Sequence, residues 1–191
     1  MQSKYAIAFV AALVFCGASQ AAILTTSTGA AGNTVASYSA PGQVAFDLDL
    51  ARLASTRLEF TVEAGDLLGP LSLNAIVRNL SGAALNGFDF RLDGIGFAQA
   101  GSVTPAFGTL GSVGYGSDYA SISFSSPEWA EFHFGNPLEE NGAADWLLST
   151  EGLRAGDTFS ITAEVPEPST AALMLSALCM SSLLMARRRR G

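Results

Sequence analysis

The chain has 191 residues, 49% of them hydrophobic, and its 17 acidic residues outnumber its 10 lysines and arginines. The formal net charge of −7 argues against a nucleic-acid-binding protein, because the phosphates of DNA and RNA are bound by clustered cations. The only two cysteines, Cys16 and Cys179, lie near the two ends, so no disulfide is expected to hold the part between them.

The first 21 residues have the three parts of a secretory signal peptide. A short basic start ends at Lys4, an apolar stretch runs from Tyr5 to Cys16, and Ser19-Gln20-Ala21 puts small residues where a signal peptidase reads them. We expect cleavage after Ala21. The stretch is not amphipathic, which disfavours a buried N-terminal helix, and Phe15 before Cys16 argues against lipidation of that cysteine.

Residues 22–164 form the expected exported domain, 143 residues long and sufficient for one compact core. This part has five arginines, sixteen carboxylates and no lysine, which gives a formal net charge of −11. This strong negative charge argues against binding of the domain to nucleic acid and against its adhesion to anionic lipid.

Apolar and polar residues alternate along most of this domain, as expected for β-strands with one buried face. Turn sequences such as Ser81-Gly82 and Asp93-Gly94 separate the runs. Seven or eight strands predict an all-β fold with two antiparallel sheets, a β-sandwich of immunoglobulin-like or jelly-roll-like type. The clearest runs are 44–50, 58–62, 71–79, 88–92, 120–124, 130–134 and 159–165.

Three segments are less regular. The stretch from Leu73 to Arg91 resembles the two strands that immunoglobulin-like surface modules join across the sandwich. The stretch from Ala98 to Ser117, rich in Gly, Ser and Thr, is either a long loop or a weakly patterned strand pair. The stretch from Asp145 to Leu153 begins without alternation, which favours a short helical turn.

The domain offers little catalytic chemistry, so we expect a non-catalytic protein without a cofactor. Its one histidine, His133, is expected at the surface on the outward face of its strand, and no nucleophile elbow or zinc-type cluster occurs. Paired carboxylates keep a hydrolase open as an alternative, either Glu128 with Glu131 or Glu139 with Asp145.

Two pairs of aspartates could attract calcium, Asp47 with Asp49 and Asp89 with Asp93. They lack the dense oxygen-ligand loop of an EF-hand, so solvated strand faces explain them better.

Four aromatic residues lie in or near loop-like sequence and are candidate contacts for a glycan, because sugar rings stack on flat apolar faces. The alternative is that these rings cap the ends of the sandwich. The four are Tyr115, Tyr119, Trp129 and Trp146.

The C-terminal tail has three parts. Two prolines in Pro166-Glu167-Pro168 favour an exposed, extended linker over residues 165–170. The uncharged run from Ala171 to Ala186 predicts a helix of roughly 24 Å, somewhat short of the roughly 30 Å hydrocarbon core but compatible with a thin transmembrane span. Residues 187–191, with four arginines, should stay in the cytoplasm while everything before Pro166 lies outside.

In order and spacing, these parts resemble the PEP-CTERM sorting tail of Gram-negative bacterial envelope proteins. The resemblance covers about a seventh of the chain. It implies processing by exosortase, an integral-membrane cysteine protease-transpeptidase, with Pro166, Glu167 and Pro168 as the recognised residues. It also implies a stop signal made by Arg187, Arg188, Arg189 and Arg190. An ordinary single-span anchor is the alternative.

The leading expectation is therefore a surface or extracellular-matrix protein associated with exopolysaccharide or biofilm. Its expected partners are signal peptidase, exosortase, the inner membrane before processing, and exopolysaccharide. It would be anchored transiently in the inner membrane and then reach the cell surface or the medium. The alternatives are a carbohydrate-binding module and a secreted hydrolase that uses paired carboxylates.

Overall fold

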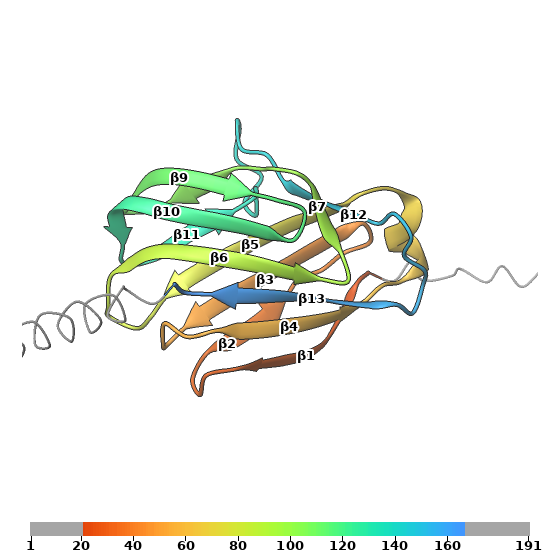
Figure 1. Cartoon of the computed structure of the whole chain (residues 1–191), viewed down its shortest axis with the longest axis horizontal. Helices are drawn as coiled ribbons and strands as arrows, with labels where there is room; N and C mark the ends of the chain where they lie inside the picture. Colours follow the sequence, from red (N-terminus) through yellow and green to blue (C-terminus); the bar gives the residue numbers. More distant parts are fainter. Residues whose placement is uncertain (1–20, 167–191) are drawn as a thin grey trace, which may run out of the picture.

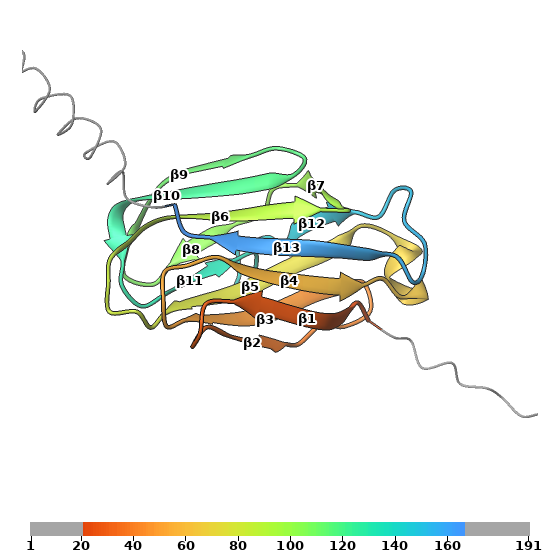
Figure 2. The same ribbon diagram turned by 60° about the horizontal axis from the view of Figure 1, so that its bottom comes forward.

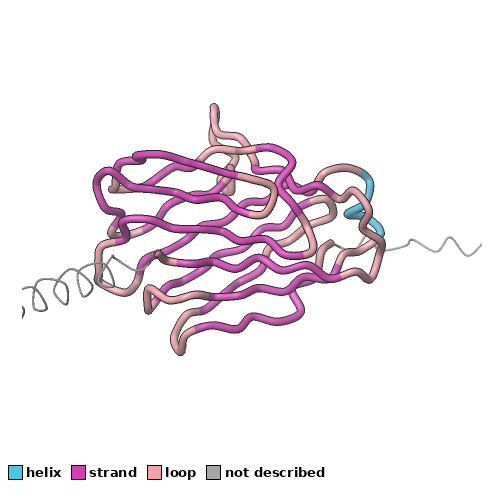
Figure 3. The backbone as a smooth tube through the Cα atoms, in the orientation of Figure 1, coloured by secondary structure: helices cyan, strands magenta, loops and turns pink. Residues whose placement is uncertain are grey.

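The computed structural model of the protein describes residues 21–166. The expected signal helix and transmembrane helix lie outside these residues, as do Glu167, Pro168 and the four C-terminal arginines. The described part consists of strands, loops and one short 3-10 helix, η1 (Ala64–Leu68), at one end (Figure 3). The expected all-β fold is confirmed.

The first sheet has six strands, and every neighbouring pair in it is antiparallel (Figure 1). In spatial order they are β1 (Ile23–Gly29), β4 (Thr56–Thr61), β13 (Thr158–Glu164), β6 (Leu85–Asp93), β10 (Tyr119–Glu128) and β9 (Thr109–Tyr115).

The second sheet has seven strands and is mixed, which corrects the expectation of two purely antiparallel sheets. The chain leaves β3 for β4 in the first sheet and returns through η1, so β5 starts beside the start of β3 and runs parallel to it. The strands are β2 (Thr34–Ser37), β3 (Gln43–Leu50), β5 (Leu71–Asn79), β11 (Glu131–Phe134), β8 (Val103–Pro105), β12 (Trp146–Ser149) and β7 (Gly96–Gln99).

The core lies between the two sheets and is rich in aromatic rings. Phe46 from the second sheet meets Phe90 from the first edge-to-face at 6.1 Å, and Phe60 stacks on Phe159 at 5.3 Å. Buried aromatic pairs of this kind add to the free energy gained by burying their area. This core contains no cysteine, so packing provides the stability that a disulfide would otherwise supply.

All seven expected strand runs correspond to strands. Two of the irregular segments could be assigned only from the structure. The stretch from Ala98 to Ser117 contains β8 and β9, which lie in different sheets. The helical turn expected after Asp145 is wrong: β12 occupies that position, because Trp146 and Leu148 both point into the core. Strands β5 and β6 lie in different sheets, as the resemblance to immunoglobulin-like modules implied.

The described chain begins and ends at opposite ends of the sheets (Figure 2). Ile23 and Thr158 are both paired with Thr61 at one end, which we call the N-terminal end. Gly29 and Ala163 are both paired with Thr56 at the other end. We call this second end the tail end, because β13 finishes there and Pro166 follows.

Candidate functional site

The sorting motif begins at the tail end, directly after the last strand. Val165 still packs against the core, whereas Pro166 is exposed. The ring of Pro166 lies beside β6, with its Cγ 3.8 Å from the position that a Cβ would take at Gly87. The first proline of the motif thus lies at the end of a folded sheet, in an accessible position.

Glu128 is the last residue of β10 and has a fully buried side chain. Its Oε2 accepts the N–H groups of Phe107 and Gly108 at 2.9 and 2.8 Å, and its Oε1 accepts those of Trp129 and Ala130, both at 2.9 Å. Burial by itself would raise the pKa of Glu128. The four backbone hydrogen bonds outweigh burial and hold this pKa below its usual value.

This geometry argues against Glu128 as one half of a catalytic pair with Glu131. Both oxygens of Glu128 are occupied by backbone donors inside the fold, whereas Glu131 lies on the outer face of the second sheet, with its Oε2 3.4 Å from Arg78. A general acid and base must face a common cleft. Of the second pair, Glu139 is exposed in the loop of residues 135–145, and Asp145 ends that loop before β12.

The outer face of the second sheet carries an ion-pair network centred on Arg78. Its guanidinium contacts Asp47 at 2.8 Å and Asp49 at 3.2 Å, and hydrogen bonding to Asp47 is the main cause that raises the pKa of Arg78. His133 lies on the expected face, but its side chain is only 14% exposed, with Nε2 3.6 Å from Glu131.

The four aspartates considered as calcium ligands form ion pairs with arginines. Asp47 and Asp49 both contact Arg78, Asp93 lies 3.4 Å from Arg57, and Asp89 lies 4.0 Å from Arg91. Within residues 21–166, no group of three or more His, Cys, Asp or Glu side chains is placed to hold a metal ion.

The four candidate aromatic residues do not form one platform. Trp146 is fully buried, stacked on Phe134 at 4.5 Å, and its indole N–H donates to the carbonyl of Ser102 at 3.0 Å. The interpretation of Trp146 as a glycan contact is therefore wrong, because both faces of its ring are inside the fold.

The other three candidates are exposed but divided between the two ends. Tyr115 and Tyr119 lie at the N-terminal end, where Tyr115 packs edge-on against Trp146 and Tyr119 lies over the guanidinium of Arg91. Trp129 lies past the far end of β10, about 30 Å of extended strand from Tyr119. These three side chains therefore do not form one stacking surface.

A groove that the sequence did not indicate opens between β3, β5, the loop that follows β2 and the loop of residues 135–145. Its volume is about 320 Å³, and its polar lining residues are Tyr38, Gln43, Asp47, Asn74, Asn136 and Glu139. Asn136 braces the loop: its N–H donates to Asn74 Oδ1 at 2.6 Å, and its side chain donates to the carbonyl of Glu140 at 3.1 Å. The groove joins segments far apart in the sequence, so no local pattern marks it.

The neighbouring Gly135 shows how tightly this loop is built. Its φ is +81°, and a Cβ there would meet the side chain of Asn74 and the carbonyl of Leu73. Only glycine fits both the backbone conformation and the space.

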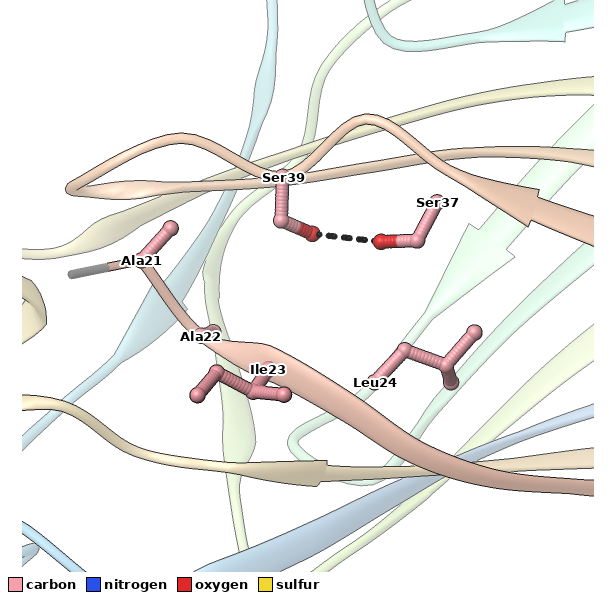
Figure 4. Close-up of a pocket in the computed structure, with 6 residues that line it drawn as sticks. All are labelled: Ala21, Ala22, Ile23, Leu24, Ser37 and Ser39. Atoms are coloured by element: carbon pink, nitrogen blue, oxygen red, sulfur yellow. Dashed lines mark hydrogen bonds between the residues drawn. The ribbon is translucent and has the colours of Figure 1, made fainter.

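A second, shallow pocket lies where the exported domain is expected to begin (Figure 4). It is lined by Ala21 to Leu24 together with Ser37 and Ser39, whose hydroxyl groups are hydrogen-bonded at 3.2 Å. Ala22, the expected first residue after cleavage, is almost fully buried. The pocket belongs to the start of the domain and gathers no titratable side chain.

Comparison with known proteins agrees with the tail geometry. The PEP-CTERM protein-sorting motif matches residues 164–190 of the chain. This motif is that of an exported protein that is sorted by an exosortase, and it implies transient anchoring in a membrane before processing. The chain thus carries a PEP-CTERM sorting tail directly after β13. No curated protein and no solved structure matches the chain. Within the described part of the chain, no helix is long and apolar enough to cross a membrane.

Proposed function

We propose that this protein is a non-catalytic component of the cell surface or extracellular matrix, released from the inner membrane by an exosortase and associated with exopolysaccharide. The observation that carries the proposal is the sorting motif at residues 164–190, which begins where an exposed Pro166 follows the last strand. The exported β-domain is the cargo, and the tail is its removable anchor.

The test is deletion of the exosortase gene in the native cell. The chain should then stay in the inner-membrane fraction, whereas in the parent strain it should leave that fraction. The Glu167→Ala variant should reproduce the deletion, and Glu140→Ala, in an exposed loop of the domain, should behave like the parent. Equal release with and without exosortase would refute the proposal.

The polar groove favours a second candidate function, carbohydrate recognition by the same exported domain. Tyr38 is 62% exposed and stands beside Gln43, Asp47 and Asn136, so one apolar ring and several hydrogen-bonding groups converge. Sugar-binding sites combine these two kinds of contact. Saturable binding to bacterial exopolysaccharide that Tyr38→Ala abolishes and Tyr119→Ala preserves would favour this function. Binding unaffected by Tyr38→Ala would exclude the groove.

A further inference from the structure

The loops at the two ends of the sheets differ sharply in charge. The five loops of the tail end contain one charged residue, Arg52, and no carboxylate; they are residues 30–33, 51–55, 80–84, 106–108 and 129–130. The loops of the N-terminal end contain five carboxylates and one arginine, in residues 38–42, 62–70, 94–95, 116–118 and 150–157. The loops of the tail end therefore carry none of the domain's carboxylates, and the nearest partly exposed ones, Glu131 and Glu164, belong to the strand ends.

The same tail-end loops expose three large apolar side chains. Phe107 is 77% exposed, Leu80 is 59% exposed and Trp129 is 56% exposed. We call Leu80, Phe107 and Trp129 the tail-end patch. Exposed aromatic residues gathered on one surface of a soluble domain commonly mark a site of contact with a partner or a membrane.

Backbone hydrogen bonds hold the three residues of the patch close together. The N–H groups of Phe107 and Trp129 donate to the same carboxylate, that of Glu128, both at 2.9 Å. Asn79, directly before Leu80, donates its N–H to the carbonyl of Ala130 at 2.6 Å. Glu128 thus fixes the backbone positions of Phe107 and Trp129.

The patch also lies close to the start of the apolar segment of the tail. Pro166 packs beside Gly87, two residues along β6 from Leu85, which is paired with Glu128. Only residues 167–170 separate Pro166 from the apolar run that begins at Ala171. Five Cα steps span at most roughly 18 Å even when fully extended. A membrane holding that run would lie within reach of the tail end.

We propose that the tail-end patch is a membrane-contacting surface. While the tail is anchored, Leu80, Phe107 and Trp129 lie in the headgroup region of the bilayer, where Trp and other amphipathic rings are favoured. The tether makes this contact intramolecular, so a small patch is sufficient. The contact keeps the domain seated on the membrane and the Pro-Glu-Pro linker at a fixed depth, and it is lost when the tail is removed.

This inference rests on the membrane anchoring in the proposed function, and the test separates the two. The full chain, with its tail uncut, is reconstituted into phosphatidylcholine vesicles brominated on the acyl chains, and flotation and tryptophan emission are both measured. Trp129 emission should be quenched, whereas emission from the buried Trp146 should not. The quenched component should disappear in Trp129→Phe.

A matched control places a tryptophan at the other end of the domain. Leu68 is 91% exposed in η1 at the N-terminal end, so Leu68→Trp in the Trp129→Phe background should show no bromine quenching. A chain that floats but shows equal quenching at the two positions, or none, would overturn membrane contact by the tail-end patch. Membrane anchoring by the tail would still stand. A chain that does not float overturns both. If quenching of Trp129 required added exosortase, the tail-end patch would be a binding site for that enzyme, and direct membrane contact would be overturned.

Discussion

The carboxylate of Glu128 accepts the backbone N–H of Gly108 at 2.8 Å, although the two residues are twenty positions apart in the sequence. This bond ties the turn between β8 and β9 to the end of β10. Together with three further N–H groups, it makes Glu128 a structural anion that organises the tail end of the domain. The carboxylate accepts backbone N–H groups there, as a backbone carbonyl would do elsewhere in a sheet.

Replacing Glu128 with Gln should lower the free energy of unfolding by about 2 to 4 kcal/mol, because the amide nitrogen cannot accept a hydrogen bond and would face two N–H groups. Denaturant unfolding of the exported domain measures this loss. Glu131→Gln, which changes a half-exposed carboxylate three residues away, is the control and should cost well under that amount. Equal losses in the two variants would contradict the role of Glu128.

The lowered pKa of Glu128 also predicts a pH dependence. Because its pKa is lower in the folded than in the unfolded state, Glu128 stabilises the fold fully above the ordinary pKa of a glutamate. This contribution falls as the pH drops through that value toward the folded-state pKa. The stability difference between the parent and Glu128→Gln should therefore shrink from pH 7 toward pH 3. A difference independent of pH would show that the carboxylate charge is not what stabilises the loops.

Arg78 should contribute more to the stability of the second sheet than any other arginine of the described domain. Arg78→Gln leaves Asp47, Asp49 and Glu131 close together without a cation, and we expect a loss of about 1 to 2 kcal/mol. Part of it should be recovered at 1 M salt, because salt screens the remaining repulsion. Arg57→Gln removes a single exposed pair with Asp93 and should be nearly neutral. A salt-independent loss in Arg78→Gln would point to packing instead.

The two tryptophans should respond in opposite ways to truncation. Trp146→Ala removes a buried ring stacked on Phe134 and should cost about 3 to 5 kcal/mol, whereas Trp129→Ala should change stability by less than about 0.5 kcal/mol. Thermal unfolding of the two variants provides the comparison. Similar melting temperatures would mean that the Trp146 ring does not stabilise the core.

Sequence patterns identified the strands whose two faces differ in burial. In β3, buried and partly exposed residues alternate without interruption from Gln43 to Leu50, and the run was recognisable from its residues alone. Strand β9 could not be found in this way, since all seven of its residues are exposed and its pattern lacks a buried face. Trp146 was misplaced because three consecutive apolar residues hide which side of β12 faces the core.

The parallel pairing of β3 with β5 and the buried Glu128 depend on segments distant in the sequence. The parallel pair arises only because β4 crosses to the other sheet before the chain returns. Glu128 resembles any surface carboxylate until the turn containing Phe107 and Gly108 is placed against it. The sorting tail was recognisable at once, because its proline motif, apolar run and arginine cluster are contiguous.

Whether the tail is a removable handle on an exported domain can be decided from the intact mass of the protein purified from its native cell. We expect a chain that begins at Ala22 and ends within residues 165–170. A mature protein that still carries Arg187 to Arg190 would contradict this expectation.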